Sequence, residues 1–124
     1  KKAGYKNIQA YNKNMPKKDK MSYIVNVIDE VAELVLTFTG DTEKAKKHKL
    51  VNLLVSITQI GRATGLHCIL ATQNPTVEVI NSLIKSNCTT RIGLRVATPA
   101  NSVTLGVKDA HKIKATYGFG VLQD

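Results

Sequence analysis

Apolar residues along the chain gather into three short runs that are separated by longer segments of mixed polarity. The first run covers Tyr23 to Ile28, is rich in β-branched residues and ends in two adjacent acids, Asp29 and Glu30. Continuous apolar runs of this length are typical of strands that are buried on both faces of a parallel sheet. We therefore predict a buried strand here, with two carboxylates at its carboxyl end.

The second run, residues 67–73, also ends in polar residues, and the third covers residues 89–96. In the third run Ile92, Leu94 and Val96 alternate with other residues, which predicts that these three side chains point inward. Long crossovers between hydrophobic strands imply a parallel sheet with right-handed connections. The pattern therefore predicts an α/β fold.

The longest segment with helical periodicity is 43–64, in which Leu50, Leu54 and Ile57 belong to one apolar face. Four lysines crowd its first turns, where they oppose the helix dipole, so a start near Lys47 is an alternative. Asp41 or Thr42 is expected to cap this helix. The other predicted elements are helices over 30–39 and 77–86, a short helix that opens at Pro99 and a short edge strand over 118–122.

The chain has 124 residues, which suits one domain, and a formal net charge of +9. Residues 1–20 contain seven Lys and one Asp, and they show no sustained periodicity. We predict a loop with one short helix for this segment. A surface that faces phosphates would explain the charge, but the sequence favours a solvated connector.

The two cysteines, Cys68 and Cys88, lie in apolar runs without a C-x-x-C spacing or a histidine pattern. This arrangement disfavours metal binding and redox catalysis and favours buried free thiols in a reducing compartment. No apolar stretch approaches the roughly 20 residues that a membrane-spanning helix needs. A signal peptide is not visible either.

Candidate chemistry lies at the ends of the first two predicted strands. Asp29, Glu30 and Gln73 would share one edge of the sheet, where open α/β sheets bind their ligands. NTPases of the P-loop class hold Mg²⁺ with an Asp at this place. Two plainer interpretations stay open: the acids could simply open a helix, and Gln73 could be a turn residue before Asn74 and Pro75.

Five spaced segments carry motifs in a fixed order. Residues 23–34 are similar to the pattern Y-I-V-x-x-I-D-E-x-A-D-L, and residues 70–75 are similar to L-A-T-Q-R-P. In these and in residues 4–12, 61–67 and 79–92, the chain resembles the motor domain of the FtsK/SpoIIIE family of DNA translocases. The resemblance covers residues 4 to about 105. It implies a partial RecA-like P-loop NTPase core, with a mostly parallel sheet flanked by helices. Residues 1–22 would be a basic lead-in, and residues 23–124 the C-terminal part of the motor domain.

The chain also departs from the family pattern. No G-x-x-x-x-G-K-[ST] phosphate loop occurs in it, and the family has Arg where Asn74 stands. In the family, the phosphate loop and a segment with a plausible arginine finger lie upstream of the position of Lys1. The last residues, from His111 onward, also differ from the family's L-L-G-x-G-D-M-L. These departures indicate a mobile-element or conjugation relative, and a fragment that is inactive alone.

The resemblance assigns roles to five residues. Asp29 would hold Mg²⁺ through water, Glu30 would be the general base for attack on the γ-phosphate of ATP, and Gln73 would sense the nucleotide. Arg62 and Arg91 would contact phosphates of DNA, or of nucleotide across a subunit junction. Surface arginines in salt bridges are the alternative for both.

The longer protein is therefore expected to be an ATPase that forms a hexameric ring and moves double-stranded DNA, in chromosome partitioning or conjugative transfer. Type VII secretion ATPases, which move proteins, belong to the same family and are the alternative. A non-hydrolysing structural domain is a third possibility, which retention of Asp29, Glu30 and Gln73 disfavours. We expect a cytoplasmic location, with membrane attachment only through segments outside these residues.

Overall fold

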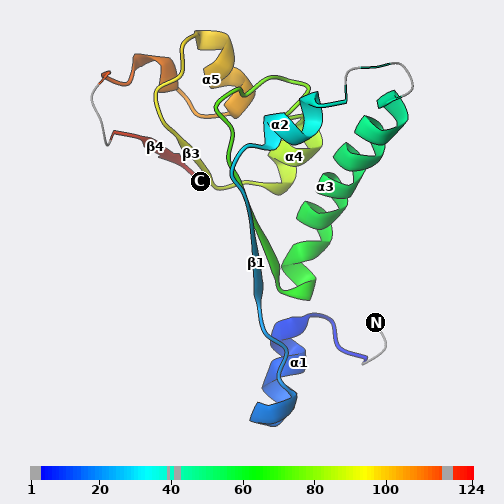
Figure 1. Cartoon of the computed structure of the whole chain (residues 1–124). Helices are drawn as coiled ribbons and strands as arrows, with labels where there is room; N and C mark the ends of the chain where they lie inside the picture. Colours follow the sequence, from blue (N-terminus) through cyan, green and yellow to red (C-terminus); the bar gives the residue numbers. More distant parts are fainter. Residues whose placement is uncertain (1–3, 39, 41–42, 116–118) are drawn as a thin grey trace.

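The polar and apolar segments form alternating helices and strands, which Figure 1 shows in a computed structural model of the chain. The structure describes residues 4–38, 40, 43–115 and 119–124. Its order of elements agrees with the predicted β–α–α–β–α–β series, with the short helices expected within residues 1–20 and from Pro99, and with a short strand near the end of the chain. The elements are α1 (Ile8–Asn14), a 3-10 helix (Lys17–Asp19), β1 (Ile24–Ile28), α2 (Val31–Leu36), α3 (Lys44–Thr64), β2 (Leu66–Leu70), α4 (Ser82–Asn87), β3 (Arg91–Gly93), α5 (Pro99–Leu105), a second 3-10 helix (Ala110–Lys112) and β4 (Val121–Gln123).

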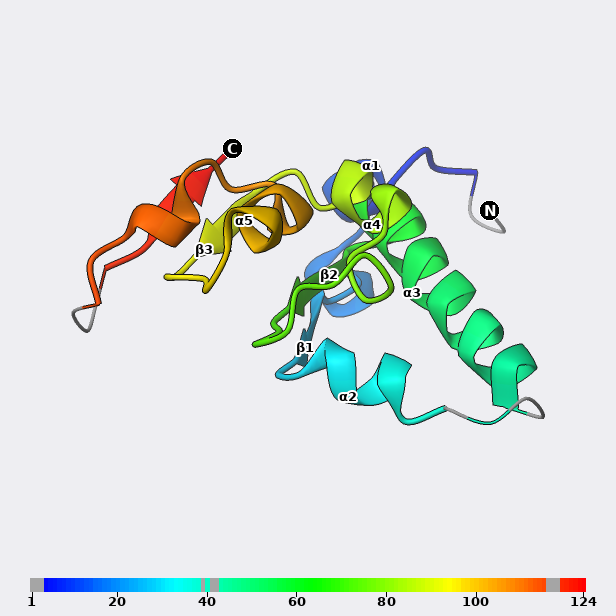
Figure 2. The same cartoon turned by 90° about the horizontal axis from the view of Figure 1, so that it is seen from above.

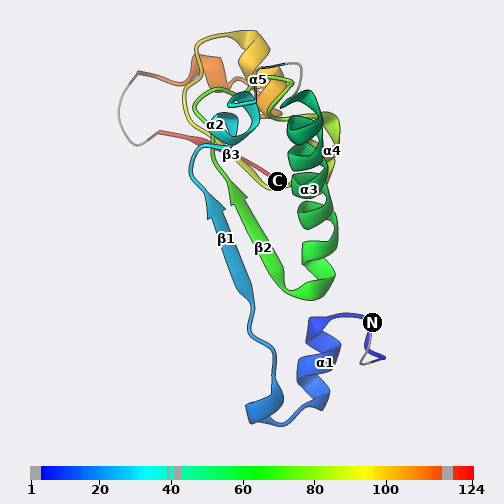
Figure 3. The same cartoon turned by 45° about the vertical axis from the view of Figure 1, so that its right-hand side comes forward.

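The first two strands form a parallel pair, as predicted. Ile24 lies opposite Leu66, and the register continues to Ile28 opposite Leu70. The connection between them runs through α2 and α3, and Figure 3 shows α3 lying alongside the pair. Because the strands are parallel, their carboxyl ends meet at one edge, which places the residues after Ile28 beside those after Leu70.

The main hydrophobic core lies where α2, α3 and α4 meet the carboxyl ends of this pair. Val31 and Val35 of α2, Leu54 of α3 and Ile84 of α4 are buried in one cluster, together with Val79. Ile28 and Leu70 pack against it as partly buried residues. The core therefore fixes the point at which both strands end.

The prediction that the strands are buried on both faces is wrong for the described residues. Ile24, Val25 and Val27 are each about 60% exposed, and Ile69 is 53% exposed. Within the described part of the chain, β1 and β2 pair only with each other, and α3 is the helix that packs along β2. The apolar residue types are typical of a sheet that is covered on both faces, but the described residues cover the β1–β2 pair on one side only.

The third predicted strand is shorter than expected, and it pairs antiparallel instead of joining the parallel pair. β3 pairs antiparallel with β4, and Figure 2 shows both strands gathered with α5 to one side of the β1–β2 pair. Ile92 is 71% exposed and Leu94 65% exposed, whereas Gly93 is buried. A Cβ on Gly93 would lie 2.9 Å from Val107 Cγ1, so the glycine is the position that packs closely. The predicted inward direction of Ile92 and Leu94 is therefore wrong.

α3 confirms the predicted helix over about 43–64, because it begins at Lys44 and not near Lys47 and is followed by Gly65, which adopts a left-handed φ of 80°. The boundaries of two other helices differ from the predictions. α2 ends at Leu36, and α4 begins at Ser82 because the Asn81 side chain accepts a hydrogen bond from Ile84 N. The expected capping residues Asp41 and Thr42, and the start of the expected edge strand at Gly118, lie outside the described residues.

Candidate functional site at the carboxyl ends of the parallel strands

Backbone hydrogen bonds hold the two strand ends together beyond the last paired residues. Ala71 N donates to Ile28 O at 2.8 Å, and Val31 N donates to Ala71 O at 2.9 Å. The acids that follow β1 and the polar residues that follow β2 are therefore kept side by side, as the sequence predicts. This edge is where an open α/β sheet binds its ligand.

Glu30 is the most heavily bonded side chain at this edge. Its Oε1 accepts a hydrogen bond from Thr72 Oγ1 at 2.5 Å, and its Oε2 accepts one from Gln73 N at 2.7 Å. Oε1 also accepts from Ala32 N at 3.0 Å, which makes Glu30 the N-cap of α2. The carboxylate thus bridges the end of β1, the start of α2 and the turn after β2.

These hydrogen bonds lower the pKa of Glu30 below its ordinary value. The Thr72 hydroxyl is the largest cause, the Gln73 N–H follows, and partial burial opposes both. Hydrogen bonds to a carboxylate favour its charged form. Glu30 is therefore ionised at neutral pH while it bridges the two strand ends.

Asp29 differs from its neighbour because its side chain is exposed and makes no hydrogen bond or ion pair with any described residue. A free carboxylate at the end of a buried-type strand suits Mg²⁺, which prefers oxygen ligands and usually keeps several waters. Among the described residues, no group of three His, Cys, Asp or Glu could hold a metal ion. The residues present therefore fit a metal held through one carboxylate and water, and they do not include a phosphate loop.

The turn after β2 brings Gln73 to the same edge. Gln73 is exposed, its N–H is bonded to Glu30, and Asn74 N donates to Thr72 Oγ1 at 3.1 Å. Pro75 is buried and ends this polar segment. Gln73 therefore is a turn residue and also lies beside the acids, so the two interpretations of the sequence are compatible.

Thr72 is a further residue of the site, which the sequence alone does not predict. Its hydroxyl donates to Glu30 and accepts from Asn74 N, so it joins the carboxylate to the turn. The sequence does contain a signal for this role, because a hydroxyl residue between a strand and an X-Pro turn often forms hydrogen bonds with nearby backbone.

The two arginines lie away from this edge. Arg62 is exposed in the last turn of α3, near the amino end of β2, where it lines a pocket of about 320 Å³. Arg91 is half-buried, and its guanidinium donates to Lys85 O at 2.7 Å and to Gly106 O at 3.3 Å. Its Nε is buried without a partner within the described residues. Arg91 therefore ties the last turn of α4 to the end of α5.

Both cysteines are free, and both line the pocket beside Arg62. Their side chains are half-buried rather than fully buried. Burial raises the pKa of each thiol, so both are protonated at neutral pH. The thiols are therefore free, as predicted, but they are less buried than the prediction states.

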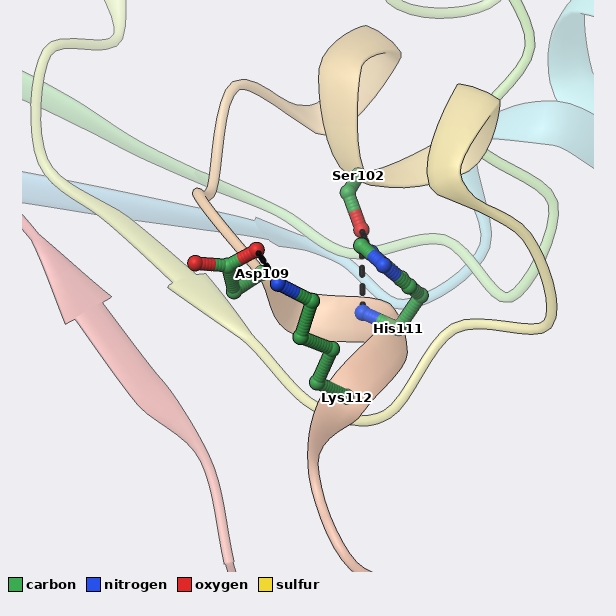
Figure 4. A network of polar contacts seen from close by, with 4 residues as sticks. All are labelled: Ser102, Asp109, His111 and Lys112. Atoms are coloured by element: carbon green, nitrogen blue, oxygen red, sulfur yellow. Dashed lines mark hydrogen bonds and ion pairs between the residues drawn. The ribbon is translucent and has the colours of Figure 1, made fainter.

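A second polar group lies in the C-terminal part of the chain (Figure 4). Ser102 Oγ, which is buried, accepts from His111 N at 2.9 Å and lies 3.0 Å from His111 Nδ1. Lys112 pairs with Asp109 at 2.9 Å, and its hydrogen bond is the main cause that lowers the pKa of that exposed carboxyl. The contacts of Ser102 with His111 fasten the second 3-10 helix to α5 beside a pocket of about 400 Å³.

Comparison with known proteins identifies the family. The sequence profile of the FtsK/SpoIIIE family matches residues 4–77. The chain belongs to the FtsK/SpoIIIE family. It is 37% identical over 102 residues to the DNA translocase FtsK of Chlorobaculum tepidum, a match that covers 82% of this chain and 12% of that protein. The resemblance seen in the sequence is thus confirmed, and the chain spans about an eighth of this relative.

Two solved structures share the fold. The conjugation coupling protein TcpA of pCW3, in its monomer form with ATPgS, superposes with a TM-score of 0.85 at 30% identity, covering 98% of this chain and 35% of that one. The cytoplasmic domain of the Thermomonospora curvata type VII secretion ATPase EccC gives a TM-score of 0.78 at 26% identity, covering 98% and 14%. The predicted class, an α/β partial P-loop NTPase core, is confirmed by these likenesses. Among the described residues, no helix is long and apolar enough to cross a membrane.

Proposed function

We propose that these residues belong to an ATP-driven motor that moves double-stranded DNA as a hexameric ring. Strand β1, with Asp29 and Glu30 at its end, would be the Walker B strand of this motor. The observation that carries the proposal is the pairing of a free carboxylate, Asp29, with a bonded carboxylate, Glu30, at the shared edge of β1 and β2. Membership of the FtsK/SpoIIIE family and the likeness to a conjugation coupling protein support the choice of a DNA motor.

In this proposal Asp29 would hold Mg²⁺ through water, and a phosphate loop outside these residues would hold the ATP. Mg²⁺ bound in this way neutralises charge on the phosphates. Asp29 is suited to the role because it is exposed and has no competing partner among the described residues. The chain alone lacks the phosphate loop, so it is expected to be inactive by itself.

Glu30 is proposed to accept a proton from the attacking water. Its lowered pKa keeps it ionised, but three hydrogen bonds occupy its oxygens. An ionised carboxylate offers about four acceptor sites, so Oε2, which accepts only from Gln73 N, keeps one for the water. We place Gln73 as the nucleotide sensor, because a shift of its turn would change the bonds of Glu30.

The basic surfaces are proposed to hold the DNA backbone. Arg62 is exposed and therefore open to a phosphate, whereas Arg91 would have to give up its bonds to Lys85 O and Gly106 O. Phosphate contacts carry no direct sequence information, so binding should be largely independent of sequence. Between the two predicted DNA contacts, the geometry favours Arg62.

Transport of proteins is the second candidate, and the likeness to EccC is the observation that favours it. One assay separates the two: the ATPase rate of the longer protein, measured with duplex DNA and, separately, with candidate secretion peptides. We expect stimulation by DNA that weakens as salt rises. Stimulation by peptide, with none by DNA at low salt, would assign the protein to secretion.

A further inference from the structure

A side-chain clasp near the start of the chain closes a loop that carries several lysines. Asn12 Nδ2 donates to Met21 O at 2.8 Å, and Met21 N donates to Asn12 Oδ1 at 2.8 Å. These two bonds fix both ends of residues 13–20, which we name the lysine loop. The 3-10 helix Lys17–Asp19 lies inside it, held by a bond from Asp19 N to Pro16 O at 2.9 Å.

The lysine loop presents a concentrated positive charge. Four of its eight residues are lysines, and Asp19 is its one acid. All four lysines are exposed, and none forms an ion pair or side-chain hydrogen bond with a described residue. Lysines elsewhere are more often neutralised: Lys47 pairs with Glu78, and Lys112 pairs with Asp109. The loop lysines are Lys13, Lys17, Lys18 and Lys20.

The loop rests on a fixed support. Asn7 caps α1 by accepting from Ala10 N at 2.8 Å, and Ile8 is only 4% exposed. Ile8 packs so closely over Gly65 that a Cβ there would clash with it. α1 is thereby anchored at the turn between α3 and β2, and the loop at its end is held rather than free.

The lysine loop also lies far from the carboxylates. Figures 1 and 3 show α1 beyond the amino end of β1, at the opposite end of the strand from Glu30. Arg62 lies in the last turn of α3, near the same end of the pair. The lysine loop and Arg62 therefore place positive charge at the end of the sheet opposite to the candidate nucleotide site, where a polyanion could bind without meeting Asp29.

We propose that the lysine loop is a contact for the phosphate backbone of duplex DNA, separate from the predicted contacts of Arg62 and Arg91. This inference rests on the proposed DNA motor. Four unpaired ammonium groups on a short closed segment suit the regularly spaced phosphates of a duplex. When lysines neutralise these phosphates, the counterions bound to the duplex are released, which favours binding. A membrane surface is the poorer partner, because membrane-binding segments add an apolar face, and inside the loop the one large apolar side chain, Met15, is half-buried.

The test is the salt dependence of DNA binding by the 124-residue chain, measured by fluorescence anisotropy with a labelled duplex between about 50 and 200 mM salt. The variant Lys17→Gln/Lys18→Gln/Lys20→Gln is compared with a charge-matched control, Lys49→Gln/Lys108→Gln/Lys114→Gln, whose lysines are also exposed. We expect the loop variant to bind about tenfold or more weakly, with a log–log salt slope smaller by about 2 to 3. The control should stay within about twofold of the wild type if its lysines do not touch DNA.

A charge-neutral variant tests the clasp. Asn12→Ala removes both bonds to Met21 and leaves all four lysines in place. We expect affinity several-fold below wild type at every salt concentration, because a loose loop loses more conformational entropy on binding. Affinity equal to the wild type would show that the clasp does not present the lysines.

Two results would overturn the proposal. Equal binding by the loop variant and the charge-matched control would exclude the lysine loop as a particular contact. Tighter binding to anionic phosphatidylserine vesicles than to duplex DNA, lost in the loop variant, would assign the loop to a membrane. Either result leaves the DNA motor testable on its own, because DNA stimulation of the longer protein's ATPase is a separate measurement.

Discussion

Glu30 and Arg91 are both charged side chains bonded to more than one element, yet they differ in what surrounds them. Glu30 is held by three donors: the Thr72 hydroxyl and the Gln73 N–H in the turn 72–74, and the Ala32 N–H in α2. It also lies beside the free carboxylate of Asp29. Arg91 is held by carbonyls at the ends of two helices, and its Nε is buried. A turn can shift without unfolding the chain, whereas the guanidinium of Arg91 joins two helix ends to each other. The comparison suggests that Glu30 can change partners and that Arg91 is an anchor.

The largest expected effect is on hydrolysis by the longer protein. Glu30→Gln keeps the shape of the side chain and removes the base, so the ATPase rate should fall by about 10² to 10⁴-fold. Nucleotide binding should stay near the wild-type level, because Asp29 is unchanged. Both quantities can be measured by steady-state turnover and by titration with a fluorescent ATP analogue.

A variant with a near-normal rate would contradict the assignment of Glu30 as the base. It would leave Glu30 as the N-cap of α2, the plainer role that the sequence also allows. The Gln side chain can still accept the bond from Ala32 N, so loss of the helix cap would not by itself explain a large fall in rate.

The next effect is on stability and concerns the other member of the comparison. Arg91→Ala removes the bonds to Lys85 O and Gly106 O and should lower the free energy of unfolding by about 2 kcal/mol. Arg62→Ala is the matched control, since Arg62 is exposed, and it should change stability by less than about 0.5 kcal/mol. Urea unfolding of the 124-residue chain measures both.

The outcome for DNA binding sharpens this contrast. If Arg91 is an anchor, its variant should lose DNA binding only as far as it loses folded protein. A stable Arg91→Ala chain with weakened DNA binding would instead support the contact that the sequence resemblance implies.

The sequence predicts elements well where one segment decides them. The β1 run, the long α3 helix and the start of α5 at Pro99 are predicted from local patterns, because periodicity and proline act within a few residues. The exposure of Val25 and Val27 was not predictable in this way. An apolar run indicates that a strand prefers apolar contacts. It does not indicate whether the segment that makes these contacts lies within the same 124 residues.

The candidate site shows the same division. The sequence placed Asp29, Glu30 and Gln73 at one edge, because parallel strands bring their carboxyl ends together. It did not predict that Thr72 bonds to Glu30, or that Gly93 rather than Ile92 packs inward. Both depend on side chains from distant segments, whose approach is set by tertiary packing.

The smallest expected effect isolates the hydroxyl that holds Glu30. Thr72→Val removes the bond to Oε1 and the acceptor for Asn74 N, and should cost about 1 kcal/mol at neutral pH. Thr76→Val is the control, because the Thr76 hydroxyl is buried without a partner in the described residues and its removal should be neutral or stabilising.

The hydrogen bond between Thr72 and Glu30 should also make the stability of the chain depend on pH. The hydrogen bonds lower the folded-state pKa of Glu30 below its ordinary value of 4.5. A lowered carboxyl pKa contributes stability above the unfolded-state pKa, and this stability is lost as the pH falls through the folded-state value. Because the Thr72 hydroxyl is the largest cause of the shift, Thr72→Val should lose less stability than wild type or Thr76→Val on acidification from neutral pH. Urea unfolding at neutral pH and below 4.5 tests this, and equal losses in all three proteins would show that Thr72 does not hold the Glu30 carboxylate in solution.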